Sequence, residues 1–152
     1  MMNNLYIFAC LKKPTMRFEK SEHFDELKPH KLEMSFGTFY FCDKFFISEL
    51  NEGVHFEWDK IEDVMAELIK FYGKDAKLGY IPNRVNSYSV NPQYWDKVDK
   101  KYNMIIASAI VVYSPMTMLN ATLEKRFFSK SMKRCESLSE AIKWMLSLKE
   151  FN

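Results

Sequence analysis

The sequence is short of glycine and proline, with four and five residues respectively in 152. This scarcity argues against a disordered or linker-rich chain, and we find no internal repeat. Cysteine is also rare: Cys10, Cys42 and Cys135 form no CxxC pair, and their odd number does not suggest a disulfide framework. Free thiols that act as small hydrophobic side chains fit a reducing compartment, so we expect a cytoplasmic protein.

The sequence also has no large excess of positive or negative residues. The 22 Lys and Arg residues nearly balance the 20 Asp and Glu residues, which leaves a net charge of +2. Because the two signs are interspersed, we expect no binding to nucleic acid. No apolar run reaches the length of a membrane-spanning helix. The run from Leu5 to Leu11 is followed by basic residues and has no small-residue cleavage site, so we do not expect a signal peptide.

The length predicts one domain, and 47% hydrophobic residues are enough for a sizeable core. We place this domain at residues 33–152. Residues 1–32 are expected to form an N-terminal extension, in which 5–9 could be a short strand or a sticky tail. The charged segment 17–31 is interpreted as a linker or a weakly amphipathic piece. Met16 is an alternative initiator, which would place residues 1–15 outside the native protein.

The most informative stretch is Met104 to Tyr113, a ten-residue uncharged run rich in β-branched side chains. A strand with one face in water alternates polar and apolar residues, whereas a strand covered on both faces is apolar throughout. This run therefore predicts a buried strand. Ser114 and Pro115 follow directly and predict a helix start, because serine caps helices and proline fits their first turn. A buried strand that leads into a helix is typical of layered α/β domains.

The rest of the chain supplies helices and strands around this run. Residues 34–42 and 45–50 are predicted to form a hairpin. A helix should follow from Asp59, with Glu62 in a capping box and Gly73 as its C-terminal cap. Further strands are expected at 78–81 and 131–135. Further helices are expected from Asn91-Pro92 to 101, at 115–128 with Leu119, Leu123 and Phe127 as its buried stripe, and from a Ser137–Glu140 capping box to 148. The order is β-β-α-β-α-β-α-β-α.

This order resembles the STAS fold of anti-sigma-factor antagonists. More specific similarity lies in the last fifty residues: the strand with Ala107–Val112, the helix with Ala121–Phe128, and the ending Leu138-Ser-Glu-Ala-Ile-Lys-Trp144. The ending is similar to that of small SpoIIAA-like proteins of STAS type, and Ile81–Ser89 resembles members from Bacteroidetes-type bacteria. The resemblance covers residues 33–150. It implies a mixed sheet opened by a hairpin and a regulatory protein that binds a protein partner.

In that family, a partner kinase phosphorylates a serine in an Asp-Ser-(Ser/Thr)-Gly-like motif, which switches binding to an anti-sigma factor. The corresponding loop here is Asn83 to Ser89, and it contains neither the Asp-Ser pair nor the glycine. Ser87 and Ser89 lie nearby and are the candidate phosphorylation sites, although neither matches the motif residue by residue.

A binding rim is predicted independently from position. If strands 78–81 and 104–113 are parallel, their carboxyl ends share one edge, where open α/β sheets bind ligands and partners. Helix N-termini at 91–92 and 114–115 would add free backbone N–H groups. The candidate rim residues for a partner or ligand are Asn83, Arg84, Asn86, Ser87, Tyr88, Ser89 and Ser114. The alternative interpretation is that the Asn, Ser and Pro residues here only cap helices.

No catalytic or metal-binding motif is present. His23, His30 and His55 lack metal-ligand spacing, Cys42 lies in an apolar strand, and we predict no metal, cofactor or enzymatic activity. The aromatic-rich hairpin is expected to be mainly core, and an excess of rings could form a patch for a partner or a second subunit. We therefore expect a non-catalytic protein-binding module, with a homodimer possible. The alternative is a carrier or sensor of a small-molecule or lipid-like ligand, bound in an apolar pocket between sheet and helices.

Overall fold

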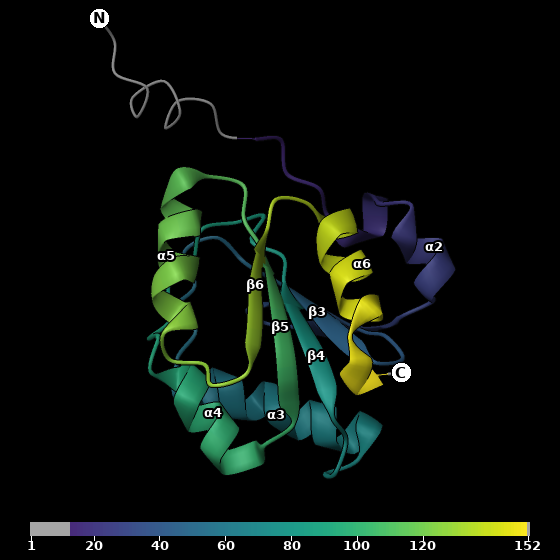
Figure 1. Ribbon diagram of the computed structural model, residues 1–152, viewed down its shortest axis with the longest axis vertical. Helices are drawn as coiled ribbons and strands as arrows, with labels where there is room; N and C mark the ends of the chain where they lie inside the picture. The colour runs from purple at the N-terminus through teal and green to yellow at the C-terminus, as the bar shows by residue number, and fades with distance from the viewer. Residues whose placement is uncertain (1–12, 152) are drawn as a thin grey trace, which may run out of the picture.

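Six strands form one mixed sheet, and their order across the sheet is their order along the chain. The computed structural model describes residues 13–151 (Figure 1). The strands are β1 (His30–Met34), β2 (Gly37–Phe41), β3 (Phe45–Leu50), β4 (Leu78–Pro82), β5 (Ile105–Val111) and β6 (Ser131–Cys135). Strands β1, β2 and β3 pair antiparallel, whereas β3 to β6 pair parallel. The α/β class is therefore confirmed.

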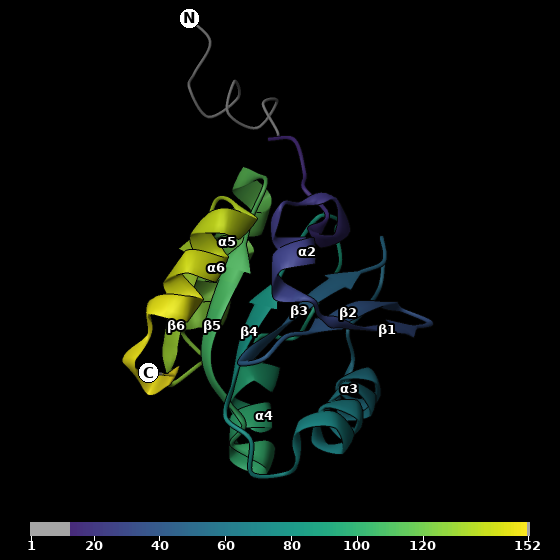
Figure 2. The ribbon, with the colours of Figure 1, turned by 90° about the vertical axis from the view of Figure 1, so that its right-hand side faces the viewer.

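Helices connect the parallel strands and cover both faces of the sheet. They are α2 (His23–Leu27), α3 (Trp58–Tyr72), α4 (Tyr94–Tyr102), α5 (Pro115–Lys125) and α6 (Leu138–Ser147), with short 3-10 turns η1 (Phe18–Lys20) and η2 (Lys149–Phe151). Helices α3, α4 and α5 pack on one face, and α6 packs with η1 and α2 on the other. Figure 2 shows β1 and β6 at opposite edges of the sheet.

Strand β5 is covered on both faces, as its uncharged sequence predicted. Ile110 belongs to the core under α3, α4 and α5, whereas its neighbours Ala109 and Val111 belong to the core under α6. All three are fully buried. The same alternation occurs in β3, where Phe46 faces one core and Phe45 the other. The sheet therefore separates two hydrophobic cores.

The predicted strand 34–42 is present as β2 but begins too early, because a turn at Ser35 and Phe36 separates it from Met34, the last residue of β1. The chain therefore has one strand more than predicted before α3. Gly37 allows β2 to approach β3 closely, since a Cβ there would lie 2.9 Å from Leu50 and from the carbonyl oxygen of Glu49. The hairpin of β2 and β3 agrees with the prediction.

The interpretation of residues 17–31 as a linker is also wrong. This segment contains η1, α2 and the start of β1. Phe18 is fully buried, and its ring lies 4.9 Å from Tyr40 and 5.7 Å from Phe24 in edge-on geometry. The charged residues of this segment therefore flank one buried aromatic side chain, Phe18, which packs against Tyr40 of the sheet. The predicted short strand at residues 5–9 lies outside the described residues.

Two predicted serine caps are present, and two predicted starts are wrong. The hydroxyl of Ser114 accepts a hydrogen bond from the N–H of Thr117, and that of Ser137 accepts one from Glu140. In contrast, α3 begins at Trp58 after Glu57, so Asp59 is not its cap. Helix α4 begins at Tyr94 rather than at Asn91-Pro92. The Asn91 side chain caps the turn before it by accepting from the N–H of Gln93 at 3.0 Å.

Helix α5 turns a different face inward from the predicted one. Leu119 and Leu123 are exposed, whereas Ala121 and Glu124 are buried. The helix also ends at Lys125 rather than at 128. Helix α5 turns this face inward because the carboxylate of Glu124 accepts hydrogen bonds from two buried side chains of other elements, as described below.

Candidate functional site

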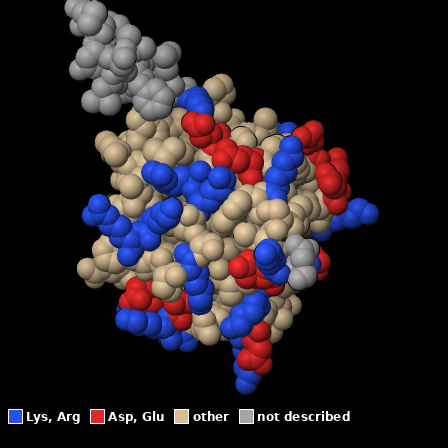
Figure 3. Space-filling view, viewed as in Figure 1, with Lys and Arg blue, Asp and Glu red and all other residues tan. Residues whose placement is uncertain are grey.

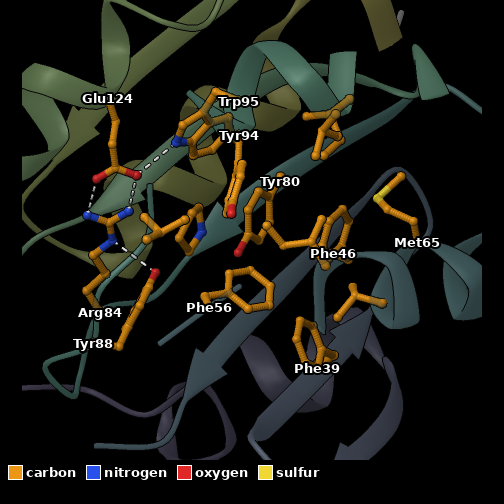
Figure 4. A pocket seen from close by; sticks show the side chains of 16 residues that line it. Phe39, Phe46, Phe56, Met65, Tyr80, Arg84, Tyr88, Tyr94, Trp95 and Glu124 are labelled. Carbon is orange, nitrogen blue, oxygen red and sulfur yellow. Dashed lines mark hydrogen bonds and ion pairs between the residues drawn. The ribbon is translucent and has the colours of Figure 1, made fainter. Parts of the chain in front are cut away.

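A hollow lies between the sheet and helices α3, α4 and α5. Phe39, Phe46 and Tyr80 contribute its wall on the sheet, and Met65, Trp95 and Val98 contribute its wall on the helices. Figure 4 shows these aromatic side chains pointing toward a common space. The rings of Phe46 and Tyr80 stack with centroids 4.5 Å apart and an interplanar angle of 10°. The body of this pocket is therefore apolar and flat-sided.

The pocket is small and opens toward the loop after β4. Its cavity volume is about 60 Å³, and the hollow together with the solvent at its mouth has a volume of about 570 Å³. Tyr88, Val90 and Tyr94 are lining residues that stay partly exposed and so form the mouth. An apolar cavity of roughly 150 Å³ is known to accept benzene. A ligand of that size would therefore need the mouth residues to move outward.

One end of the pocket is polar. Arg84 follows β4 and forms two hydrogen bonds of 2.6 Å with the carboxylate of Glu124 on α5. The indole N–H of Trp95 on α4 donates to the same carboxylate at 2.8 Å. Both charged side chains are buried, with 7% and 2% of their surface exposed. The paired geometry satisfies the carboxylate and neutralises the guanidinium charge.

Tyr88 stands beside this ion pair. Its hydroxyl oxygen accepts a hydrogen bond from Nε of Arg84 at 3.1 Å, and its ring lies 5.2 Å from the guanidinium carbon. Burial raises the pKa of Tyr88, so the phenol keeps its proton at neutral pH. Since the oxygen is used as an acceptor by Arg84, the hydroxyl proton is the donor that this end of the pocket can offer a ligand.

Asn83 belongs to a second, separate polar cluster on the other face of the sheet. Its side-chain amide donates to Glu49 at 2.6 Å and to the carbonyl of Met16 at 2.9 Å, and its oxygen accepts from Tyr113 at 2.7 Å. The same Glu49 oxygen accepts from the N–H of Phe18 at 2.8 Å. Burial raises the pKa of Glu49. This cluster holds the segment around Met16 and Phe18 against the sheet.

The remaining rim residues have structural contacts or face solvent. Asn86 donates to the carbonyl of Leu50 at 3.0 Å, and Ser114 caps α5. Ser87 and Ser89 are exposed. The hydroxyl of Ser89 is hydrogen-bonded to Nδ1 of His55. The structure therefore brings Arg84 and Tyr88 together in the pocket and leaves the two serines outside it.

The sequence did not reveal Glu124, Trp95 or Tyr80 as parts of one site. Sequence patterns place Trp95 in a helix and Tyr80 in a strand, and they indicate no role for Glu124. Its partner Arg84 is 40 residues away. No local pattern marks such a carboxylate as buried. The useful signal was the charge of Arg84 beside a buried strand, because a buried cation requires a buried anion.

Residues 13–151 lack two further features, a metal-binding cluster and a membrane-spanning helix. No group of three or more His, Cys, Asp or Glu side chains there could hold a metal ion. Within the same range, no helix is both long and apolar enough to cross a membrane. No protein family, curated protein or solved structure matches the chain.

Proposed function

We propose that the protein binds a small uncharged molecule with an apolar body and a single hydrogen-bond acceptor. The observation that carries this proposal is the aromatic pocket with the Tyr88 hydroxyl at its polar end. Flat apolar walls favour a ring or a compact hydrocarbon skeleton. The protonated phenol of Tyr88 favours a carbonyl or ether oxygen on that skeleton.

An anionic ligand fits less well, although an arginine lines the pocket. The guanidinium of Arg84 already makes two charge-assisted bonds with Glu124 and one bond with Tyr88. A ligand carboxylate would compete with Glu124 and leave a buried charge without its partner, which is costly. A ligand cation would similarly have to displace Arg84. Electroneutrality of the ion pair therefore supports a neutral ligand.

The position of the pocket also supports ligand binding. Pro82 ends β4 and lines the pocket, and Arg84 follows two residues later. Open α/β sheets commonly bind ligands beyond the carboxyl ends of their parallel strands. The sequence predicted a binding rim at this edge. The pocket extends from the edge into the space between the sheet and helices α3, α4 and α5.

The test uses two neutral ketones, acetone and cyclopentanone, with cyclopentane and butyrate as matched probes. Each is titrated into ¹⁵N-labelled full-length protein, and the indole signal of Trp95 is followed by NMR. We expect the ketones to shift this signal saturably. In Tyr88→Phe, their affinity should fall about 5- to 10-fold, the usual size of one lost hydrogen bond, while that of cyclopentane stays unchanged. Ser89→Ala, outside the pocket, is the control and should bind normally.

Two outcomes would contradict the proposal. One is that no probe shifts the Trp95 signal although the variants remain folded. The other is that butyrate binds more tightly than the ketones, which would mean that Arg84 is available to anions.

A second candidate function is a regulatory protein-binding module of STAS type. The observation that favours it is the exposure of Ser87 and Ser89 on the loop beside the carboxyl end of β4. A phosphate on either serine would add negative charge to an accessible loop. The test is the intact mass of the protein purified from its own host. A covalent excess that maps to Ser87 or Ser89 supports this candidate, and an unmodified chain that retains its partners after Ser87→Ala and Ser89→Ala argues against it.

A further inference from the structure

Helix α5 carries an apolar stripe on its outer face. Met116, Leu119 and Leu123 have exposed fractions of 66%, 64% and 46%. Their spacing of three and four residues places them on one side of the helix, and Arg126 continues the same line three residues later. Among the described residues, six large hydrophobic side chains are exposed, and half of them lie in this stripe. Such clustering differs from the singly scattered apolar residues of an ordinary surface and indicates an interaction site.

The charged side chains around the stripe are basic. From Ser114 to Arg134 the sequence has five basic residues and one acidic residue, Glu124. Glu124 is buried and bound to Arg84, so it adds no negative charge to this surface. Arg134 of β6 lies against α5, because its guanidinium donates to Oγ1 of Thr122 at 2.6 Å. Figure 3 shows mainly uncharged and basic side chains over the side occupied by α5 and β6.

Most of this positive charge is not neutralised within the described part of the chain. Lys130 pairs with Asp99, and Lys133 lies 3.8 Å from a carboxylate oxygen of Glu140. The other three basic side chains are exposed and have no carboxylate partner among residues 13–151: Lys125, Arg126 and Arg134. The stripe is therefore bordered by free cations, which acidic groups on a partner would complement.

A hollow lies where the stripe ends, between α4 and the residues that follow α5. Its volume is about 630 Å³. Arg126 lines it on one side, and Tyr94 and Lys97 line it on the other. Asp96 also lines the hollow, and its carboxylate already pairs with Lys100 at 2.8 Å. The combination of apolar and basic side chains therefore continues from α5 into a concave surface.

We propose that the stripe and this hollow bind an acidic amphipathic helix of a partner protein. A helix presents apolar side chains at the same spacing of three and four residues as the stripe, so the two helices can pack side by side. Acidic residues beside its apolar face would pair with the free cations. A second copy of the chain fits less well, because it would bring more positive charge to the contact. A membrane surface also fits less well, because lipid-binding segments carry clusters of about four to eight basic residues.

The test selects binders to the full-length protein from a phage-displayed library of random peptides of about 16 residues, or about four helical turns. We expect the enriched peptides to carry Asp or Glu beside apolar residues spaced three and four apart. Leu119→Gln with Leu123→Gln should weaken their binding at least about tenfold, because the apolar anchors are lost. Phe71→Gln, at an exposed apolar position on α3, is the control and should bind normally. Circular dichroism verifies that each variant is folded.

The charge of the surface is tested with the same peptides. Arg126→Gln with Arg134→Gln should weaken their binding at low salt and reduce its dependence on salt concentration. Lys70→Gln with Lys74→Gln removes two exposed positive charges near the end of α3 and is the matched control, which should change neither quantity.

Several results would overturn the proposal. One is that the library yields no peptide that prefers the unmodified protein over Leu119→Gln with Leu123→Gln. Another is that the peptides which depend on the stripe are basic or uncharged. A dimer of the unmodified protein that this double variant converts to a monomer would show that a second copy covers the stripe. Binding to phosphatidylserine vesicles that the double variant loses would identify a membrane surface instead.

Discussion

Arg84 and Glu124 lie 40 residues apart and share two hydrogen bonds of 2.6 Å inside the protein. The pair joins the loop after β4 to α5, and the indole of Trp95 adds α4 to the same carboxylate. One ion pair therefore fixes three elements around the pocket.

Removing either partner of this pair should be strongly destabilising. In Arg84→Met or Glu124→Leu, the free energy of unfolding should fall by about 3–5 kcal/mol, because the remaining charge is buried without its counterion. The double variant should recover much of this loss. Asp96→Asn, which breaks the exposed ion pair with Lys100, is the control and should leave the free energy of unfolding almost unchanged. Urea denaturation measures all four, and additive losses in the double variant would contradict coupling.

Glu49 should make stability depend on pH in a defined direction. Burial raises its folded-state pKa above the ordinary value of 4.5, so the folded chain binds this proton more tightly than the unfolded chain. Its contribution to the free energy of unfolding is therefore fully present below about pH 4.5 and is lost as pH rises through the folded pKa.

Glu49→Gln should remove this dependence and stabilise the protein at pH 7. A glutamine carbonyl can accept the same bonds from the N–H of Phe18 and the amide of Asn83, because both reach one carboxylate oxygen. Glu49→Ala loses both and should cost about 1–3 kcal/mol. Denaturation curves from pH 4 to 8 provide the measurement. A Gln variant with an unchanged pH slope would show that Glu49 titrates normally.

A side chain at Gly79 should force the buried side chain of Met145 to move. A Cβ at this position of β4 would lie 2.3 Å from the sulfur of Met145, which is fully buried on α6. Gly79→Ala should therefore cost about 1–3 kcal/mol by overpacking. In a Met145→Ala background, the cost of Gly79→Ala should be much smaller. Gly53→Ala is strained by its φ of +78° and not by any neighbour, so its cost should be independent of residue 145.

The thiols of Cys42 and Cys135 should be unreactive in the folded protein. Burial raises the pKa of each to about 12, so almost no thiolate exists at pH 8. We expect iodoacetamide to label them no faster than the chain unfolds, and to label them rapidly in 6 M guanidinium chloride. Peptide mass spectrometry measures both rates. Fast labelling of either one under native conditions would contradict its burial.

Local patterns in the sequence predicted the elements whose partners are generic hydrophobic surfaces. The uncharged run gave β5, and the apolar spacing gave the buried faces of α3 and α6. The serine caps at 114 and 137 were also correct. In each case, the deciding physics acts within a few residues of the chain.

Features that depend on a particular distant partner were not predictable. Glu124 is buried because Arg84 and Trp95 require it, and this forces Leu119 and Leu123 outward against the apolar pattern of α5. Phe18 lies in a charged segment and is buried because its ring packs against Tyr40 and its backbone N–H donates to Glu49. The burial of Phe18 could not be predicted from its neighbours in the sequence.

The order of the strands has a consequence for how the chain acquires its structure. Every strand pairs with the one made just before it, so no pairing waits for a later part of the chain. Each pairing closes either a tight turn or one crossover that contains a single helix, and this keeps contacts between neighbouring parts of the chain, which favours rapid folding. During synthesis, the sheet can therefore grow outward from β1, one strand at a time. The contacts of Lys13 with Tyr113 and Glu136 would then form late and join an early part of the chain to its last third.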